Sequence, residues 1–395
     1  MPAPIATTPL GQTQSMQGIL VPASSVRPEE FFHRTRRHTL LESARPYAMS
    51  AAAGQDVFEL RKSDILSRLL VRFTGSLVIT TPTGTAASTA RWPYDMLNAK
   101  FTANGASNVI NASGLKLKAR DAMKRGELSD RGVSQTVGGA AKTQGTLAMA
   151  TESWGVGSNS TLSAGTYPVD LMWIVPVAED EIDLVGAIFL ATSTADLTLT
   201  LDYAPLASLF TLTGTATAAL TGTMQVTSTK FSVPIGSDGQ IVVPDLSTFH
   251  SLIQSRTTAL QNGENEIRIV GQGGGKSLLR TFYQVWNGAV SAPLAMTTAN
   301  YGKQSWRYGN NETPDEFIDG STLRYENERL YNTDLGGIWG FGCHEFASEL
   351  AFRDVVDMGT TSDLRIISNI AAGVTLTNPA IEYVTETVFQ AGTAA

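Results

Sequence analysis

Strict alternation of apolar and polar side chains in two distant segments is the feature of this sequence that most constrains its fold. The apolar face of residues 69–79 consists of Leu69, Val71, Phe73, Leu77 and Ile79. The apolar face of residues 197–203 consists of Leu197, Leu199, Leu201 and Tyr203. Successive side chains of a strand point to opposite faces, so each segment is predicted to be a strand with one buried face.

Further runs of this kind predict an all-β protein with a few short helices. The candidate strands are residues 108–117, 171–177, 223–233, 266–270, 364–370 and 381–389, separated by clusters of Gly, Pro, Asn and Asp. Only 16% of the residues are charged, and Thr, Ala and Ser are abundant, as is typical of many short strands and turns. A chain of 395 residues is long for one β-sandwich and suits two.

The charge and the cysteine content exclude several function classes. The formal net charge of -7 gives no broad basic surface, so direct binding of nucleic acid is not expected. Cys343 is the single cysteine, which excludes an intramolecular disulfide and favours folding in a reducing cytoplasm. The N-terminus lacks the basic and apolar parts of a signal peptide, and the longest apolar stretch, residues 184–191, is too short to span a bilayer. We therefore expect neither export by a signal peptide nor an integral membrane protein.

Residues 1–54 are predicted to form an N-terminal arm and a short basic helix. Residues 1–26 show no periodicity, whereas residues 28–45 begin with a proline and two glutamates and continue with arginines, as at the two ends of a helix. Such a helix either lies on a membrane surface or docks its apolar side on a β-domain. Our hypothesis is that a membrane faces the residues Arg27, Phe31, Phe32, Arg34, Arg36, Arg37 and Arg45.

A glycine-rich loop at residues 271–277 resembles a phosphate-binding loop but has different spacing. A Walker motif places four residues between its first glycine and its Gly-Lys pair, whereas Gly271 and Gly275 enclose three. Neither a parallel sheet nor a second motif for magnesium accompanies the loop. We interpret it as a flexible turn rather than a phosphate site, and expect Lys276 to be dispensable for folding and assembly.

No catalytic, cofactor-binding or metal-binding residue is predicted, and the chain is not expected to be an enzyme. The acidic residues 179–183 lack the glycine that an EF-hand calcium loop needs where Leu184 stands. They are interpreted as a solvated loop, with a surface cation site as the alternative. Cys343 and His344 would point to opposite faces of a strand, so they are not expected to form a nucleophile and base pair.

Two segments resemble the major capsid proteins of tectiviruses, which are membrane-containing icosahedral bacteriophages. Residues 171–210 carry an aromatic-rich strand, an acidic turn, an Asp-Leu-x-Gly-Ala motif and an alternating strand. The matching positions are Trp173, Val175, Pro176, Asp183, Leu184, Gly186 and Ala187, with Ile174 inserted. Residues 233–252 are similar to the family's junction between two domains, with matches at Pro234, Gly236, Gly239, Pro244, Asp245, Leu246, Ser247 and Thr248.

This resemblance implies a double jelly roll, with two eight-stranded β-sandwiches in tandem at residues 55–238 and 239–395. The expected interdomain turn consists of Pro234, Gly236, Asp238, Gly239 and Pro244. Glycine permits the backbone angles of a reversal, and proline interrupts a continuous ladder.

The resemblance also implies a structural function. The expected protein is the major coat protein of an icosahedral virion with an internal lipid membrane, assembled in the host cytoplasm into the capsid shell. It implies a homotrimer of pseudo-hexagonal outline that contacts neighbouring capsomers, penton or vertex proteins, minor capsid proteins and the viral membrane.

Two other function classes remain open from the sequence. A β-sandwich module that binds carbohydrate or acts as an adhesin predicts a groove lined by aromatic residues, whereas the six tryptophans are scattered along the chain. A nucleotide-using enzyme predicts that Lys276 is essential.

Overall fold

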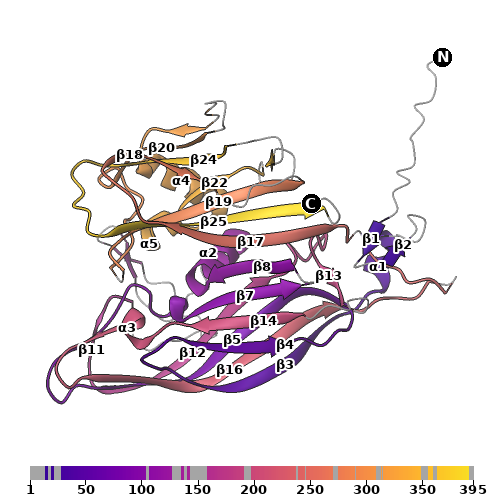
Figure 1. The fold of residues 1–395 in the computed structure, drawn as a ribbon, viewed down its shortest axis with the longest axis horizontal. Coiled ribbons are helices and arrows are strands. Elements are labelled where there is room, and N and C mark those ends of the chain that lie inside the picture. Colours follow the sequence, from indigo (N-terminus) through magenta and orange to yellow (C-terminus); the bar gives the residue numbers. More distant parts are fainter. Residues whose placement is uncertain are drawn as a thin grey trace.

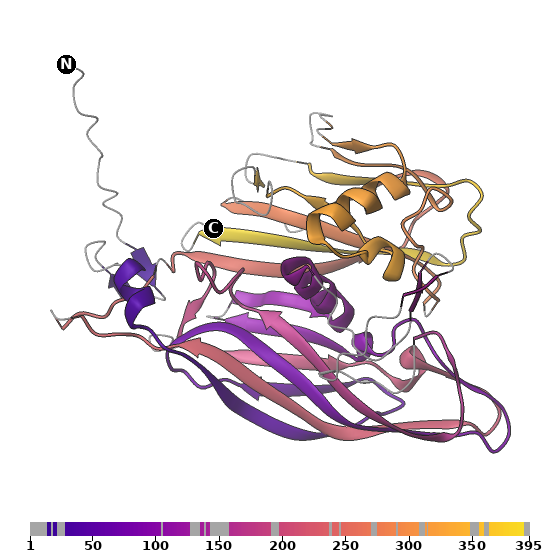
Figure 2. The same cartoon turned by 180° about the vertical axis from the view of Figure 1, so that it is seen from behind.

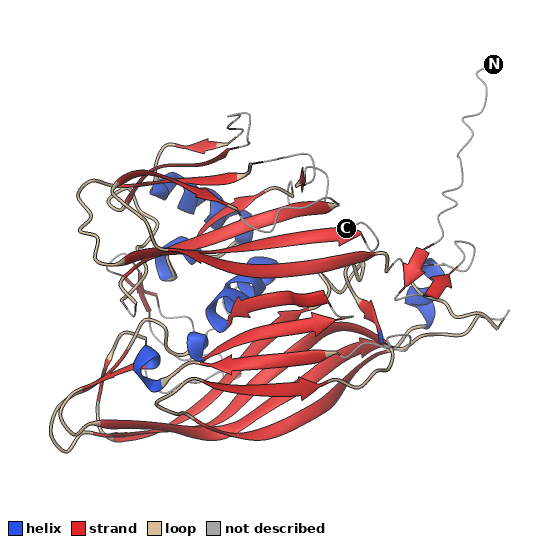
Figure 3. Ribbon diagram, viewed as in Figure 1, coloured by secondary structure: helices blue, strands red, loops and turns tan. Residues whose placement is uncertain are grey.

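The protein consists of two bodies of strands that lie side by side (Figure 1). The computed structural model describes residues 14–16, 19–21, 28–103, 106–126, 135–137, 140–142, 158–190, 197–236, 239–244, 246–269, 275–289, 291–307, 313, 315–347, 355–358 and 363–390. Strands dominate these ranges (Figure 3). None of the helices within them has the length and apolar character to cross a membrane.

The first body is a sandwich of two four-stranded sheets. Its strands are β3 (Arg37–Ala48), β4 (Gly54–Glu59), β5 (Ile65–Thr80), β7 (Leu97–Ala103), β8 (Ala106–Ser113), β12 (Gly165–Pro176), β14 (Thr198–Tyr203) and β16 (Thr217–Phe231). The sheet orders are β12-β5-β16-β3 and β8-β7-β14-β4. Counted along the chain, the first sheet joins strands one, eight, three and six, and the second joins strands two, seven, four and five. This order is that of a jelly roll.

The second body repeats the same order. Its strands are β17 (Thr248–Thr257), β18 (Gly263–Arg268), β19 (Lys276–Asn287), β20 (Tyr301–Arg307), β21 (Glu316–Phe317), β22 (Gly342–Glu345), β24 (Arg365–Ile370) and β25 (Pro379–Gln390). The sheet orders are β22-β19-β25-β17 and β18-β24-β20-β21. The predicted all-β double jelly roll of two eight-stranded sandwiches in tandem is therefore confirmed.

Helices and shorter strands lie between or beside the main strands of the two sandwiches. The helices are α1 (Pro28–Arg34), the 3-10 helix η2 (Tyr94–Met96), α2 (Gly114–Arg125), α3 (Leu206–Leu209), α4 (Gly320–Tyr331) and α5 (Leu335–Ile338). The short strands are β1 (Gln14–Met16), β2 (Ile19–Val21), β6 (Ala86–Ser88), β9 (Gln135–Val137), β10 (Ala140–Lys142), β11 (Thr161–Leu162), β13 (Ile188–Phe189), β15 (Phe210–Leu212) and β23 (Val356–Asp357). In each jelly roll the main helical insertion, α2 or α4 with α5, lies between the fifth and sixth strands, and Figure 2 shows both insertions from behind.

The two jelly rolls meet along a surface that we call the seam, where β8 lies beside β17 and α2 lies beside β25. β8 and β17 run parallel and pair only through Ile110 with Leu252 and Asn111 with Ile253. All main strands on the β8 side of this contact come from the first half of the chain, and those on the β17 side come from the second half. The pairing of β8 with β17 joins one sheet of each sandwich, together with β23, into a continuous nine-stranded sheet, in which strands of the two halves do not interleave.

The alternating segments bury the side chains that the sequence predicts. In β5, Leu69, Val71 and Phe73 are fully buried, whereas Arg72 and Thr74 are exposed. Burial of each such apolar side chain contributes about 1.5–3 kcal/mol. Period-two alternation therefore positions the core of the first sandwich.

The prediction of a helix over residues 28–45 is wrong beyond Arg34. The backbone N–H of Thr35 donates to the carbonyl of Phe31 at 2.8 Å and closes the last turn of α1. The following residues form β3, an edge strand that pairs with β16. Pairing with β16 decides the conformation of these residues, and Pro46, which has no backbone N–H to donate, is tolerated because β3 is an edge strand.

The predicted strand over residues 108–117 is too long at its C-terminal end. β8 ends at Ser113, and α2 begins at Gly114. Leucine and lysine alternate over residues 115–118 as in a strand, but all four side chains are buried in a helix between the two jelly rolls. Because leucines and lysines are both buried here, their alternation does not mark a buried and an exposed face of a strand.

Candidate functional site

A stripe of cations on α2 faces two glutamates of β25 across the seam. Lys116, Arg120 and Lys124 are spaced four residues apart, so the helix places them on one face. Glu382 and Glu386 are also four residues apart, and a strand places residues at even spacing on one face. Opposite charges from the two halves of the chain therefore meet at the seam.

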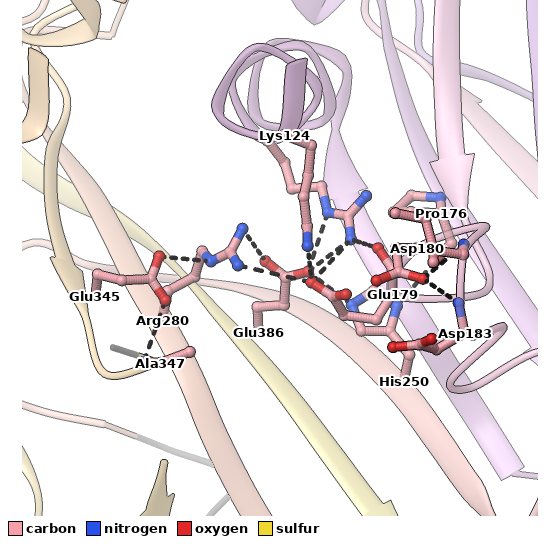
Figure 4. A network of polar contacts seen from close by, with 12 residues as sticks. Lys124, Pro176, Glu179, Asp180, Asp183, His250, Arg280, Glu345, Ala347 and Glu386 are labelled. Carbon is pink, nitrogen blue, oxygen red and sulfur yellow. Dashed lines mark hydrogen bonds and ion pairs between the residues drawn. The ribbon is translucent and has the colours of Figure 1, made fainter. Parts of the chain in front are cut away.

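Glu386 is fully buried and binds cations from both jelly rolls (Figure 4). Its Oε1 accepts hydrogen bonds from Nε and Nη2 of Arg120 at 3.0 and 2.8 Å, and Nε2 of His250 lies 2.8 Å from the same oxygen. Arg280 Nη1 lies 3.4 Å from Oε2. Burial raises the pKa of Glu386, but Arg120 and Arg280 outweigh this effect and hold the pKa well below its ordinary value. The carboxylate is therefore ionised at neutral pH.

Glu179 extends this network from the loop after β12. Its side chain is only 3% exposed and forms ion pairs with Lys124, with Arg120 at 4.0 Å and with Arg280 at 3.6 Å. Arg120 Nη2 also donates to the Glu179 carbonyl at 2.6 Å. The interpretation of residues 179–183 as a solvated loop is wrong for Glu179, because three cations of the fold bind its carboxylate.

The remaining acidic residues of this loop have other partners. Asp180 Oδ1 accepts hydrogen bonds from the backbone N–H groups of Ile182 and Asp183, both at 2.9 Å. Glu181 forms ion pairs with Arg68 at 3.1 Å and with Arg37 at 3.3 Å. Within the described ranges, no group of three or more His, Cys, Asp or Glu side chains is arranged to hold a metal ion.

Gly186 allows this loop to approach the second jelly roll. It forms a parallel bridge with Phe249, and a Cβ atom added at Gly186 would lie 2.5 Å from the Cβ atom of His250. Its φ angle of +84° also favours glycine. His250 is fixed from the other side, where Nδ1 lies 2.9 Å from the Pro176 carbonyl. The Gly186 motif noted in the sequence thus serves contact between the jelly rolls.

A second charge cluster lies at the N-terminal end of α2. Lys116, which is fully buried, donates to Glu382 at 2.6 Å and to Gln284 at 2.7 Å. Arg91 donates to Glu382 at 2.8 Å and to Asp95 at 2.9 Å. Burial raises the pKa of Glu382, but Lys116 and Arg91 together lower it to about 2. This cluster also joins residues of both jelly rolls.

Arg280 connects the Glu386 network to β22. It is 1% exposed, and its Nε lies 3.0 Å from Oε2 of Glu345. Burial lowers the pKa of Arg280, but Glu386 and Glu345 outweigh burial and raise it above its ordinary value. Removal of one partner would leave the buried charges of the network unbalanced, which is more costly than loss of an exposed ion pair.

Cys343 and His344 show no catalytic arrangement. The Cys343 thiol is buried 3.0 Å from the Tyr331 hydroxyl, and burial raises the pKa of the thiol. His344 stacks on Tyr283 with ring centroids 5.7 Å apart, and burial lowers its pKa to about 4. A protonated thiol with no hydrogen bond to an imidazole in the described residues is a poor nucleophile.

The glycine loop lies mostly outside the described residues. Residues 270–274 are among those not described, whereas Gly275 is described and Lys276 begins β19. The Lys276 ammonium lies 5.9 Å from the centroid of the Phe389 ring. Whether Lys276 is dispensable stays a prediction.

No protein-family model matches the sequence, and no curated protein matches it. Solved structures are similar over almost the whole chain. The crystal structure of the major capsid protein of STIV, the Sulfolobus turreted icosahedral virus, has a TM-score of 0.63 at 12% identity and covers 90% of this chain and 97% of that chain. The atomic structure of the same virus gives a TM-score of 0.61 at 13% identity, with 91% of each chain covered. VP54 of PBCV-1, fitted into a reconstruction of the virophage Sputnik, gives 0.50 at 9% identity, with 91% of this chain and 96% of that chain covered.

The chain shares the double jelly-roll fold of these proteins. In this double jelly roll, α1 lies near the loop that joins the two sandwiches (Figure 1). Thr35 Oγ1 donates to the Ser232 carbonyl at 2.7 Å, and Arg34 Nη1 lies 3.4 Å from the Ile235 carbonyl.

The structure gathers some of the residues that we expected to face a membrane and separates others. Phe31 is fully buried, whereas Phe32, Arg34 and Arg36 are exposed at the end of the double jelly roll where α1 lies. Arg37 begins β3 beside them, but its guanidinium pairs with the acidic loop.

Arg45 lies apart from this group, further along β3. It pairs with Asp56 at 3.3 Å and lies 4.7 Å from the Phe58 ring centroid. Arg27 falls outside the described residues.

The residues predicted to form the interdomain turn lie between β16 and β17. Ile235 and Ile241 form an antiparallel bridge, and the Val242 N–H donates to the Pro234 carbonyl at 2.9 Å. Gly236 accepts from Gly239, which has a φ angle of +77°, at 3.0 Å. Pro244 ends this segment, and Asp238 lies outside the described residues.

The described tryptophans do not form an exposed aromatic platform. Trp92, Trp173, Trp286 and Trp306 are buried, and Trp339 is half-buried. A sugar-binding groove of the type that the carbohydrate-binding alternative predicts therefore does not involve these five residues.

The buried charges of the seam were not predicted from the sequence. The four-residue spacing of Lys116, Arg120 and Lys124 was a usable signal, because a helix places such residues in one row. Their partners on β25 carry no comparable signal, since alternating glutamates are also typical of a solvated strand face.

Proposed function

We propose that this chain is the major coat protein of an icosahedral virus with an internal membrane. The observation that carries the proposal is that the complete strand order of a jelly roll occurs twice in this chain. The chain also aligns with the STIV major capsid protein over 90% of its length. A single chain with two similar sandwiches presents six such units in a trimer. A threefold molecule of this kind fits a sixfold lattice position.

The proposed partners are other copies of the chain, first in a homotrimer and then in neighbouring capsomers. Each contact within the trimer is expected to bury on the order of 2,000 Å² or more, as in permanent assemblies. Penton or vertex proteins and minor capsid proteins are further proposed partners. The protein would assemble in the host cytoplasm and reside in the virion shell, without direct contact with nucleic acid.

Electron microscopy of the purified full-length protein tests the coat-protein proposal. Particles with threefold symmetry and a hexagonal outline are expected. Analytical ultracentrifugation provides an independent measurement of mass. A stable monomer across micromolar concentrations, with no hexagonal particles at any concentration, would refute the proposal.

The end of the molecule that carries α1 is the part that we propose faces the membrane. Phe32 is 43% exposed, Ile235 is 68% exposed, and both lie near the cations Arg34 and Arg36. Exposed apolar side chains beside arginines suit the interface of an anionic bilayer, where each cation contributes about 1 kcal/mol. The fully buried Phe31 meanwhile anchors α1 to the sandwich, which combines the two roles left open for this segment.

Vesicle flotation tests the membrane proposal without disturbing the fold. The variant Phe32→Ser/Arg34→Gln/Arg36→Gln should bind vesicles containing anionic lipid several-fold more weakly than the unaltered protein, and added salt should reduce the difference. The matched control is Arg268→Gln/Arg329→Gln, which alters exposed arginines of the second jelly roll. Equal flotation of all three proteins would contradict the proposal. Deletion of residues 1–46 is unsuitable, because it removes most of β3.

A further inference from the structure

A cavity of about 390 Å³ opens beside the seam, where the two jelly rolls separate. β8 pairs with β17 over two residue pairs and then ends at Ser113, so β17 continues without its neighbour. The first jelly roll contributes Asn98, Ser113 and Asp202 to the cavity wall, and the second contributes Arg256 and Glu382.

The carboxylates in the cavity wall are already neutralised. Both oxygens of Glu382 are bound, one by Arg91 at 2.8 Å and the other by Lys116 at 2.6 Å. Asp95 accepts from Arg91 at 2.9 Å and from the Leu115 N–H at 3.1 Å. These carboxylates have no free oxygen with which to neutralise a further cation in the wall.

Both carboxylate oxygens of Asp202 also have partners. Its Oδ2 lies 2.6 Å from the ammonium of Lys100, and its Oδ1 accepts a hydrogen bond from the side-chain amide of Gln55 at 2.8 Å. Every acidic side chain of the wall is thus matched by a cation of the fold.

Arg256 is the cation of the wall that pairs with no carboxylate of the described residues. It is exposed, and although its backbone pairs with Glu382 in the ladder, its side chain makes no ion pair or hydrogen bond with the part of the chain that the structure describes. The Ser113 hydroxyl oxygen is buried and also has no hydrogen-bond partner in that part. The wall therefore combines one uncompensated positive charge with an unused hydroxyl donor.

We propose that this cavity binds a carboxylate group through Arg256, with Ser113 as a further donor. The fork of a guanidinium matches a carboxylate in a bidentate geometry. A singly charged anion balances the one excess charge, whereas a doubly charged phosphate would leave one negative charge uncompensated in the cavity. The carboxylate comes either from a free small molecule or from an acidic side chain of a second copy of this chain.

Calorimetric titration of the full-length protein with butyrate, which mimics a glutamate side chain, tests the proposal. Saturable binding is expected, with a Kd on the order of 1 mM, and inorganic phosphate should bind more weakly. Arg256→Gln should weaken butyrate binding roughly tenfold or more, because the amide has neither the charge nor the fork of donors that binds a carboxylate. Ala289→Glu places a carboxylate at the cavity rim and should compete with butyrate. Arg329→Gln, an exposed arginine on α4, is the control and should bind butyrate normally.

Sedimentation distinguishes the two sources of the carboxylate. If a second copy supplies it, butyrate and Arg256→Gln should both weaken self-association; if a small molecule supplies it, butyrate should bind without changing the oligomer. The proposal is overturned if butyrate binds Arg256→Gln as well as the unaltered protein. It is equally overturned if butyrate does not bind and Arg256→Gln leaves self-association unchanged. A monomeric protein that binds butyrate through Arg256 would contradict the coat-protein proposal alone.

Discussion

Glu386 is the residue on which the charge balance of the seam most depends. Its carboxylate lies between Arg120 of the first jelly roll and Arg280 of the second, with His250 bound to the same oxygen as Arg120. Two buried guanidinium groups would lose their shared counter-ion if this charge were removed. Buried ion networks are strongly destabilised when one partner is lost, whereas exposed pairs contribute little.

Glu386→Gln should lower the free energy of unfolding by about 3–5 kcal/mol. The amide keeps the volume of the side chain, so the loss would reflect charge rather than packing. Guanidinium denaturation of the full-length protein measures the effect, with Glu326→Gln on the surface of α4 as the control. A loss below about 1 kcal/mol would mean that the arginines find other partners or water.

At the scale of an element, α1 is a short helix in which Phe31 is the buried side chain among residues 31–34. Phe31 is fully buried in a small apolar cluster with Phe189, Phe231 and Val243, while the adjacent Phe32 is 43% exposed. The cluster includes residues from both sides of the loop that joins the jelly rolls. α1 therefore packs at the end of the molecule where that loop lies.

Phe31→Ala should destabilise the protein by about 3–5 kcal/mol, because it removes a buried aromatic ring and leaves a cavity. Phe32→Ala, the same change one residue later, should cost less than about 1 kcal/mol. Thermal unfolding of the two variants measures the difference. Equal melting temperatures would show that α1 is not held through Phe31.

At the scale of the whole molecule, the seam couples the two jelly rolls. Lys116 and Arg120 are buried against glutamates of the other half of the chain. Separating the two halves would therefore expose these charges to solvent or leave them buried without their partners. Residues 1–238 or 239–395 expressed alone should therefore be insoluble, or unfold with low cooperativity, although the boundary between them stays a prediction. Co-expression of both halves should restore a soluble complex. Independent, cooperative folding of either half, measured by calorimetry, would show that the seam is dispensable.

The seam also makes stability depend on pH through Glu382. Its pKa is lowered to about 2 from the value of 4.5 that applies in the unfolded chain. The stabilisation, about 3 kcal/mol, is fully present above pH 4.5 and is lost as the pH falls toward 2. Glu382→Gln should be less stable at neutral pH and should lose less stability over this acidic range. Denaturation curves across the range measure the slope; an unchanged slope would contradict the assignment.

The sequence alone determined the type of fold, because alternation is a local property that burial of one strand face imposes on neighbouring residues. Leu69, Val71 and Phe73 carry this pattern and are buried as predicted. Local sequence patterns failed to predict the structure where charged and apolar side chains are buried alike. They also failed where pairing with a distant strand decides the conformation of a segment. Residues 114–117, the start of α2, were predicted as the end of a strand, and this prediction failed because Lys116 is buried together with its apolar neighbours.

Only the tertiary structure decided which charges meet at the seam. Arg120 and Glu386 are 266 residues apart, and neither residue type indicates burial, since both usually lie in solvent. Their pairing depends on how α2 packs against β25, which no local window of sequence contains. The same reason explains why Glu179 was predicted to be solvated and why Arg37 and Arg45 were grouped with Arg34. A charged side chain is assigned its role by the partner that the fold places beside it, and that partner comes from a distant part of the chain.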